Sequence, residues 1–263
     1  CWVARTADLA DATAVSETLA RFTTIDEIAL VAAPGARTRA VQEAIVAHCA
    51  GLQNRFAILD GQLTTDRTPA AITGGTGDSA YAALYYPQIQ VHDPVSRIPI
   101  SIPASGHIAG IYARVDARRG VHKAPANEEV RGALGLDCTV SGGEQDRLNP
   151  QGINCIRNLT GFILVWGART LGGDANGMCK YISVRRTLIY LRESIGRGIA
   201  FAAFEPSGQA LRGRIVRLVS DFLMRLWRVR ALLGTKPEHA FFVRGDETTM
   251  PPDMLARGHL VIE

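Results

Sequence analysis

The segment from Ser105 to Gly132 concentrates side chains that could do acid–base chemistry: two histidines, three acidic residues, five basic residues and a serine. Ser105 and His107, with Asp60 or Asp116, supply the residue types of a hydrolytic triad, in which histidine takes the proton of the serine hydroxyl. The sequence has neither the GxSxG turn of α/β hydrolases nor the serine and histidine motifs of active subtilases. We therefore predict no catalytic residue. An α/β hydrolytic or nucleotide-binding enzyme is the second hypothesis.

No cofactor or metal is predicted. The glycine-rich stretch at 73–79, "TGGTGDS", lacks the GK[ST] element that holds phosphate and magnesium, so a flexible turn is expected there. The five cysteines show no CxxC pair and no suitably spaced histidine, which predicts reduced, buried thiols without a zinc site or a disulfide framework. Glu128 and Glu129 are expected to begin a solvated helix after Pro125 and not to form an acid/base pair.

The composition predicts a globular chain of one large or two smaller domains. Its 263 residues are 47% hydrophobic and 21% charged, enough to bury a full core. The longest apolar runs, at 28–34 and 161–168, are far shorter than the roughly 18 residues that cross a bilayer. The chain begins with Cys1 and no signal sequence follows, so we expect a fragment in which residues 1–23 are the remnant of a longer N-terminal region.

Apolar runs and turn residues predict a parallel βαβ core in the first two thirds of the chain. The helix at 36–52 should end at Gly51. The helix at 106–116 should pack tightly on the sheet through Gly106 and Gly110. The segment 136–152 reads as irregular, with an exposed loop at 141–152. The expected buried strands lie at 23–35, 55–60, 80–91 and 161–170.

The last third differs in charge and in its elements. Residues 174–263 hold fourteen Lys/Arg and nine Asp/Glu and so carry +5, which leaves −1 on the first 173 residues. The expected elements are helices at 181–198 and 208–234, the second closed by Gly234, and strands at 199–206, 240–250 and 257–263. Because the last strand is apolar and its backbone needs a partner, it should lie in a small sheet near "FFVRG".

The helix at 208–234 has two distinct faces. Four arginines, Arg214, Arg217, Arg225 and Arg228, fall within about 80° of one another around the helix axis. A separate, apolar face contains Leu211, Ile215, Leu218, Val219, Phe222, Leu226 and Val229. The basic face could be a solvated surface, a nucleic-acid site or a protein-binding site. Nucleic acid is the third hypothesis, because aromatic residues for base stacking do not alternate with these arginines.

Eight blocks of the sequence resemble the tail sheath proteins of contractile phage tails and related contractile injection systems, in order and spacing, over roughly residues 25–263. The resemblance implies an α/β sheath domain of subtilisin-like topology at 24–173 and a smaller α+β C-terminal domain at 174–263. It also implies N- and C-terminal arms beyond this chain that donate strands to neighbouring subunits. The blocks are "RFAILD", "SGHIAGIYARVDARRGVHKAPANE", "LNPQGINCIR", "ILVWGARTL", "YISVRRTLIYL", "FEP", "VSDFLMRLW" and "AFFVRGDETTM".

The resemblance also implies what the chain does. It would be a structural subunit that polymerises around an inner tube in stacked six-membered rings and contracts to drive the tube through a target envelope. Its partners would be other copies of itself, the tube protein, and baseplate and terminator or cap proteins, without nucleic acid, membrane or cofactor. It would be made in the bacterial cytoplasm and reside in a phage tail or an injection particle.

Two surfaces are assigned on this basis. The four arginines of the helix at 208–234 would face the tube, since a sheath helix of the C-terminal domain lines the sleeve and meets the tube through charge complementarity. The segment after Ser105 would touch neighbouring subunits through ion pairs across a polar interface. Its candidate interface residues are Arg114, Arg118, Arg119 and Lys123.

Overall fold

A computed structural model describes residues 1–263 except 207, 247–248 and 250–260. The chain forms two compact units, 1–190 and 191–263, and the division falls inside helix α6 (Ile182–Ile199). The domain limits predicted from the sequence, 24–173 and 174–263, differ from these units in placing all of α6 in the second domain. They stay a prediction. No helix among the described residues is both long and apolar enough to cross a membrane.

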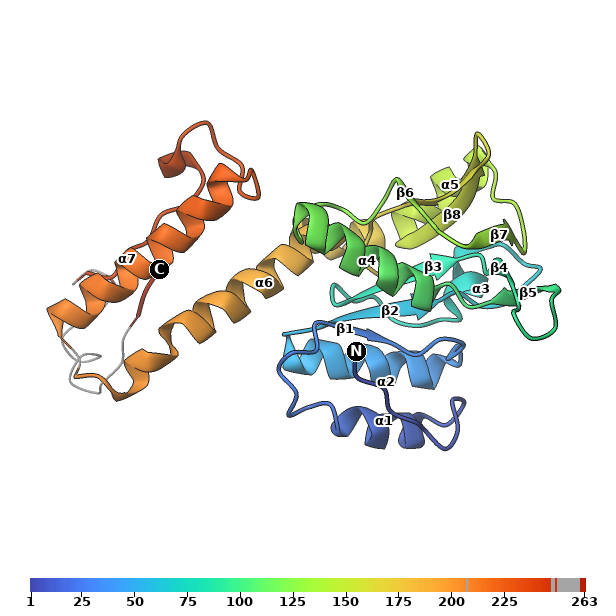
Figure 1. Cartoon of the computed structure of the whole chain (residues 1–263), viewed down its shortest axis with the longest axis horizontal. Coiled ribbons are helices and arrows are strands. Elements are labelled where there is room, and N and C mark those ends of the chain that lie inside the picture. Colours follow the sequence, from blue (N-terminus) through green and yellow to red (C-terminus); the bar gives the residue numbers. More distant parts are fainter. Residues whose placement is uncertain (207, 247–248, 250–260) are drawn as a thin grey trace. The chain divides into compact units, whose positions relative to one another are not determined.

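The first unit is built on a six-stranded sheet whose strands follow the order β1-β2-β3-β8-β9-β6 (Figure 1). The first four strands run parallel, which confirms the predicted α/β class with a parallel core. Strands β8, β9 and β6 continue the sheet in antiparallel pairs. The strand bounds are β1 (Leu30–Ala32), β2 (Phe56–Asp60), β3 (Ala82–Tyr86), β6 (Glu128–Glu129), β8 (Ile153–Leu159) and β9 (Phe162–Trp166).

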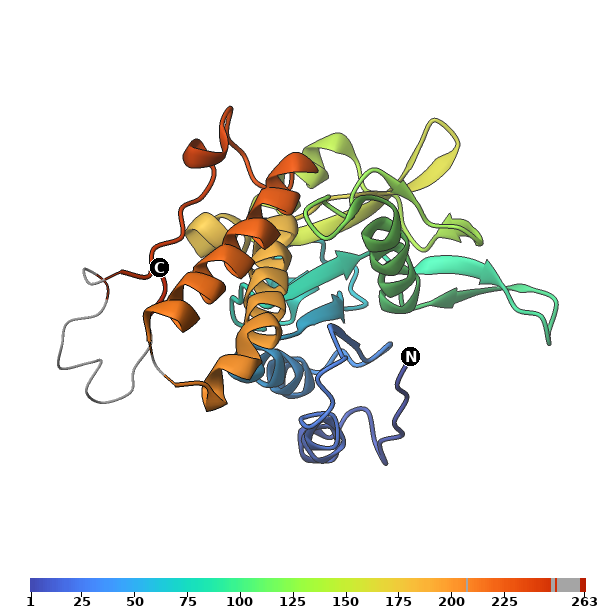
Figure 2. The ribbon, with the colours of Figure 1, turned by 60° about the vertical axis from the view of Figure 1, so that its left-hand side comes forward.

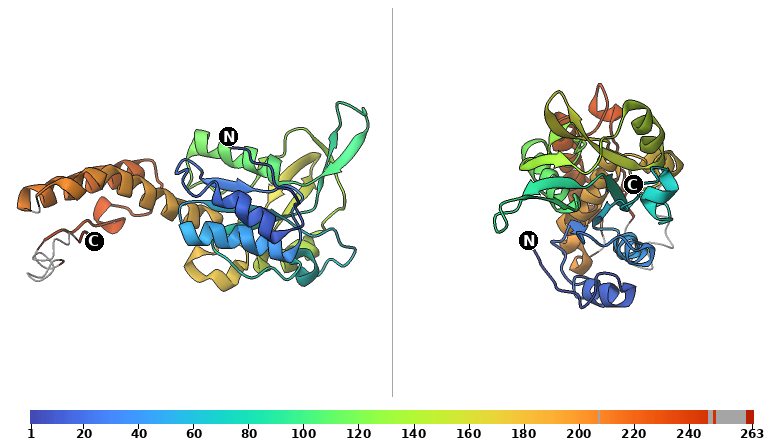
Figure 3. Two further views of the ribbon diagram at one scale, coloured as in Figure 1. Left: turned by 90° about the horizontal axis from the view of Figure 1, so that it is seen from below. Right: turned by 90° about the vertical axis from the view of Figure 1, so that its right-hand side faces the viewer.

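Helices cover both faces of the parallel strands (Figures 1 and 3). Every residue of β2 and β3 is buried, as expected for strands enclosed on two sides. Their alternate side chains enter two separate cores: one packs against α1 and α2, the other against α4 and the start of α6. The helices of this unit are α1 (Ala12–Ala20), α2 (Arg39–Leu52), α3 (Pro69–Thr73), α4 (Ser105–Arg119) and α5 (Gly142–Leu148).

A second, three-stranded sheet contains β5 (Pro99–Ile102), β4 (Ile89–His92) and β7 (Ala133–Leu136), in that order. The single strand predicted at 80–91 is therefore wrong, because it comprises β3 in one sheet and β4 in the other. Pro87 lies between them and has no backbone N–H with which to continue a ladder. The strand predicted at 161–170 is present as β9, but its predicted burial is wrong, because β9 alternates buried and exposed residues.

Several local predictions fail for identifiable reasons. The loop predicted at 141–152 contains α5, whose first turn is held by a capping box between Ser141 and Glu144, followed by a 3-10 turn (Asn149–Gln151). The predicted helix start at Glu128 and Glu129 is the short strand β6. A side chain added at Gly106 or Gly110 would meet open space, so these glycines do not bring α4 close to the sheet.

The second unit contains the C-terminal half of α6, a 3-10 segment (Ala200–Phe204), α7 (Gln209–Arg228) and a short 3-10 turn (Pro237–His239). The strand predicted at 199–206 is wrong, since that 3-10 segment occupies it. Helix α7 ends before the predicted Gly234, and Arg230 has the left-handed φ of 62° after it. The buried core of α7 packs against Leu191, Ile195 and Ile199 of α6 (Figure 2).

The two C-terminal strands predicted at 240–250 and 257–263 lie partly outside the described residues, which omit 247–248 and 250–260. No regular strand occurs in the described part of either segment. Arg244 and Glu263 nevertheless exchange two backbone hydrogen bonds, of 2.7 and 2.9 Å. This reciprocal pair confirms that the end of the chain lies beside "FFVRG", as its unpaired backbone predicted.

Candidate interaction surfaces

Helix α7 presents the predicted arginines on its exposed side. Arg214, Arg217, Arg225 and Arg228 are all exposed, whereas Ile215, Val219 and Leu223 form the buried face. The buried face is displaced from the predicted apolar face by about 50° around the helix axis: Leu218 and Val229 are exposed, and Leu223, which was left out, is buried. The amphipathic division of this helix is therefore as expected, with its centre displaced toward Leu223.

The four arginines of α7, which we call the basic stripe, differ in their surroundings. The guanidinium of Arg214 lies 4.2 Å from the ring centroid of Phe201, which fixes its position through a cation–π contact. Arg217, Arg225 and Arg228 form no ion pair with any residue that the structure describes. Three guanidinium groups on one helix face are thus available to an acidic partner.

The segment predicted to contact neighbouring subunits divides into two pairs of residues. Arg114 donates a hydrogen bond of 2.8 Å to the carbonyl of Glu129 and lies 3.5 Å from the Glu128 carboxylate. Lys123 donates to the carbonyl of Ala126 at 3.0 Å and lies 3.8 Å from the same carboxylate. These two side chains fasten the loop after α4 to β6 within one chain. The remaining pair, Arg118 and Arg119, is exposed at the end of α4.

The triad considered from the sequence is not assembled. Ser105 donates its hydroxyl to the buried carboxylate of Asp60 at 2.7 Å, and its backbone N–H donates to the same carboxylate at 2.9 Å. Asp60 also accepts from the N–H of Gly35 at 3.2 Å, so it joins the loops that follow β1 and β2 to the start of α4. His107 is hydrogen-bonded to neither residue in the described structure. Asp116 is ion-paired with Arg186 instead.

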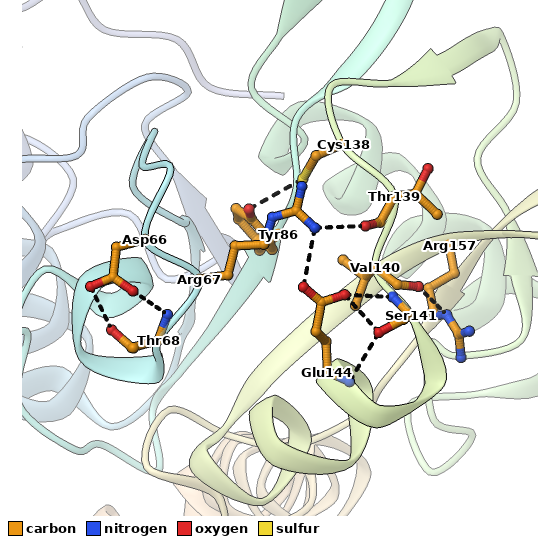
Figure 4. Close-up of polar contacts among 10 residues, drawn as sticks. All are labelled: Asp66, Arg67, Thr68, Tyr86, Cys138, Thr139, Val140, Ser141, Glu144 and Arg157. Atoms are coloured by element: carbon orange, nitrogen blue, oxygen red, sulfur yellow. Dashed lines mark hydrogen bonds and ion pairs between the residues drawn. The ribbon is translucent and has the colours of Figure 1, made fainter.

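A polar cluster that sequence reasoning missed joins the β2–α3 loop to α5 (Figure 4). Arg67 donates to the Glu144 carboxylate at 3.1 Å and to the carbonyl of Thr139 at 3.0 Å. Glu144 accepts at the same time from the backbone N–H and the hydroxyl of Ser141. Only the S-x-x-E spacing of the capping box was visible in the sequence, since Arg67 is 77 residues away.

A cavity of about 490 Å³ adjoins this cluster at the carboxyl ends of β2 and β3. Polar side chains including Arg67, Gln88 and Asp137 line it, and the hydroxyl of Tyr86 lies 3.2 Å from the sulfur of Cys138.

No group of three or more metal-binding side chains occurs among the described residues. Burial raises the pKa of the Cys49 and Cys155 thiols to about 12, so both are protonated at neutral pH and chemically inert.

The cluster predicts a pH dependence of stability. Hydrogen bonds from Ser141 and then from Arg67 lower the pKa of Glu144 to about 2. Because this folded-state pKa lies below the ordinary value of 4.5, the stabilisation is complete above pH 4.5 and is lost as the pH falls toward 2. We expect Glu144→Gln to lower the free energy of unfolding by about 1 kcal/mol at pH 7.

Urea denaturation of both proteins from pH 7 to pH 2 measures this effect. Gln can keep the capping box, so the substitution removes the charge with little change in helix geometry. The difference between the two proteins should shrink below pH 4.5. A difference that stays constant down to pH 2 would show that the carboxylate charge has no part in it.

The match to a known family covers most of the first unit. Residues 7–171 match the family model of the phage tail sheath protein central domain. The chain belongs to the phage tail sheath family. Its sequence is 30% identical over 209 residues to the tail sheath protein of Burkholderia phage BcepMu, which covers 76% of this chain and 43% of that relative. The chain thus spans less than half the length of this curated sheath relative.

Solved structures extend the similarity to both units. A chain from the anti-feeding prophage (AFP) baseplate matches with a TM-score of 0.83 and 32% identity, over 97% of this chain and 69% of its own length. A chain of the PVC sheath complex, from an extracellular contractile injection system in its contracted state, matches with the same TM-score and identity over 96% and 70%. The sheath resemblance inferred from the eight sequence blocks is confirmed.

Proposed function

We propose that this chain is a structural subunit of a contractile tail sheath, which polymerises helically around an inner tube and contracts to drive the tube through a target envelope. The observation that carries the proposal is the similarity, over 96% of the chain, to a chain of the PVC sheath complex of an extracellular contractile injection system. Matches to sheath chains in the contracted state support a sheath that changes length. The particle would be a phage tail or an injection machine assembled in a bacterial cytoplasm.

The basic stripe on α7 suits contact with the tube. Exposed ion pairs contribute only about 0–1 kcal/mol each, so a row of them holds an acidic surface yet can be broken when the sheath moves. None of the four arginines of the stripe forms an ion pair with a described residue, and Arg214 also contacts the ring of Phe201. Arg118 and Arg119 are the exposed members of the proposed subunit interface. Baseplate and terminator or cap proteins complete the expected partners.

We expect the subunit to have no catalytic activity and no cofactor. Ser105 is buried and its hydroxyl is used by Asp60, so it is not positioned to attack a substrate. The Ser105→Ala variant should lose about 1.5–3 kcal/mol of folding free energy, because that hydrogen bond is made to a buried carboxylate. His107→Ala should be near neutral. Hydrolase and ATPase assays on all three proteins should show no turnover; a turnover that disappears in Ser105→Ala would establish the enzyme hypothesis instead.

Negative-stain electron microscopy of the purified protein at its native length tests the sheath function directly. Hollow tubes, or sleeves around a co-expressed tube protein, are expected. Monodisperse particles at every salt concentration, with and without the tube protein, would contradict the proposal.

A further inference from the structure

The β4–β5 hairpin projects beyond the body of the first unit (Figure 1). The paired residues Ile89 and Ile102, then Val91 and Ile100, lie on one face of this ribbon. Along that face the exposed fraction rises from 0% at Ile89 to 38% at Ile100 and 58% at Ile98, where the ribbon leaves the core. The opposite face is polar, with Gln90, His92 and Ser101. The outer part of this face, formed by Ile98 and Ile100, is therefore left uncovered by the described chain.

The tip of this hairpin is held in one conformation. The carboxylate of Asp93 accepts hydrogen bonds from the backbone N–H groups of Val95 and Ser96, and the N–H of Arg97 donates to the Asp93 carbonyl at 2.8 Å. Arg97 has the left-handed φ of 59°, which is uncommon for a residue other than glycine. Val95, 89% exposed, is thus presented by a turn that is already ordered, so binding through it costs little conformational entropy.

A second exposed apolar patch lies on the β8–β9 hairpin of the same unit. Phe162, Leu164 and Trp166 project from one face of β9, and Phe162 is 57% exposed. Glu129 of β6 stands opposite Leu164 in the sheet, so its exposed carboxylate borders this patch. The two hairpins leave the unit at different corners (Figures 1 and 3).

We propose that the β4–β5 hairpin of one copy of this chain packs its apolar face on the Phe162–Trp166 patch of a second copy, with Arg97 opposite Glu129. The proposal rests on the proposed sheath function, which brings many copies together. The charges favour this occupant, because the exposed cation lies beside one apolar patch and the exposed anion beside the other. The two patches are different surfaces of one chain. Their contact is therefore head-to-tail and can repeat without closing on itself, as a helical sheath requires.

Disulfide trapping between two variants tests the contact. Chains carrying Val95→Cys and chains carrying Phe162→Cys, both at native length with the exposed Cys1 changed to Ser, are mixed under oxidising conditions. A covalent heterodimer should form roughly tenfold or more faster than in the control mixture, because the contact raises the effective concentration of the two thiols. The control replaces Phe162→Cys with Leu63→Cys, an exposed apolar position outside the patch.

Charge reversal supplies a second measurement. Arg97→Glu and Glu129→Arg should each slow cross-linking between Val95→Cys and Phe162→Cys, and the double reversal should restore its rate. The inference would be overturned if the double reversal did not restore the rate and if Val95→Cys cross-linked no faster to Phe162→Cys than to Leu63→Cys. Electron microscopy of the same samples separates the two proposals. Tubes without the Val95–Phe162 cross-link refute this contact and leave the sheath function standing. A specific cross-link without tubes, at any salt concentration or with the tube protein, supports the contact and counts against the sheath function.

Discussion

The double variant Arg217→Glu, Arg225→Glu should fail to bind the tube protein while its sheath subunit stays folded. Both side chains are exposed on α7, and the buried face of that helix does not include them. Under the proposed function, each reversal would replace an attraction to an acidic tube surface by a repulsion. Because the same change recurs in every copy around the tube, effects of about 1 kcal/mol per site add up to a loss of co-assembly.

Co-sedimentation of the sheath protein with its tube protein measures this loss. The matched control is Arg21→Glu, Arg131→Glu, which changes the net charge by the same amount at exposed positions of the first unit. Raising the salt concentration to 1 M should weaken wild-type binding in the same direction, because the screening length falls to about 3 Å. Unchanged co-sedimentation of the α7 variant, with circular dichroism like that of wild type, would remove the stripe from the tube interface.

The Asp116→Ala variant should be the least stable single variant considered for this chain. Asp116 on α4 accepts two hydrogen bonds, of 2.9 and 2.5 Å, from Arg186 on α6. The Arg186 side chain is only 6% exposed and lies 4.7 Å from the ring centroid of Tyr112. Removing the carboxylate leaves a buried guanidinium without its counter-charge. We expect a loss of about 3–5 kcal/mol in the free energy of unfolding.

Urea denaturation of the single and double variants isolates the cause. The double variant Asp116→Leu, Arg186→Met removes the buried guanidinium together with its carboxylate partner. It should therefore recover much of the free energy of unfolding that Asp116→Ala loses. The control is Arg39→Ala, which breaks the exposed pair with Glu43 and should cost no more than about 1 kcal/mol. A double variant as unstable as Asp116→Ala would mean that lost packing, and not the unpaired charge, is responsible.

Local sequence patterns were sufficient to predict those helices and strands whose structure depends mainly on residues close by in the sequence. The helical periodicity of 208–234 predicted α7 and the exposure of its four arginines, because side-chain direction on a helix depends only on spacing along it. The apolar segments 23–35 and 55–60 predicted two adjacent parallel strands, of which the first forms only over Leu30–Ala32. The eight sequence blocks established the family.

Other features depend on contacts that join distant parts of the chain. The α5 helix was predicted as a loop because "SGGEQDRLNPQG" has weak helical propensity, and its capping box together with Arg67, far back in the chain, stabilises it. The split of residues 80–91 into two sheets reflects which strands pair, and no local pattern contains that information.

In the interaction surfaces too, some features follow from local sequence and others from contacts between distant parts of the chain. Four basic residues were candidates for a subunit contact from sequence, because any of them could pair with a neighbour: Arg114, Arg118, Arg119 and Lys123. The fold uses Arg114 and Lys123 within the chain and leaves Arg118 and Arg119 exposed. Sequence by itself therefore determined the family, the α/β class and the basic helix face, which follow from local spacing and composition. Tertiary structure decided which charges are free and which apolar hairpins lack cover, because both depend on what the folded chain brings alongside them.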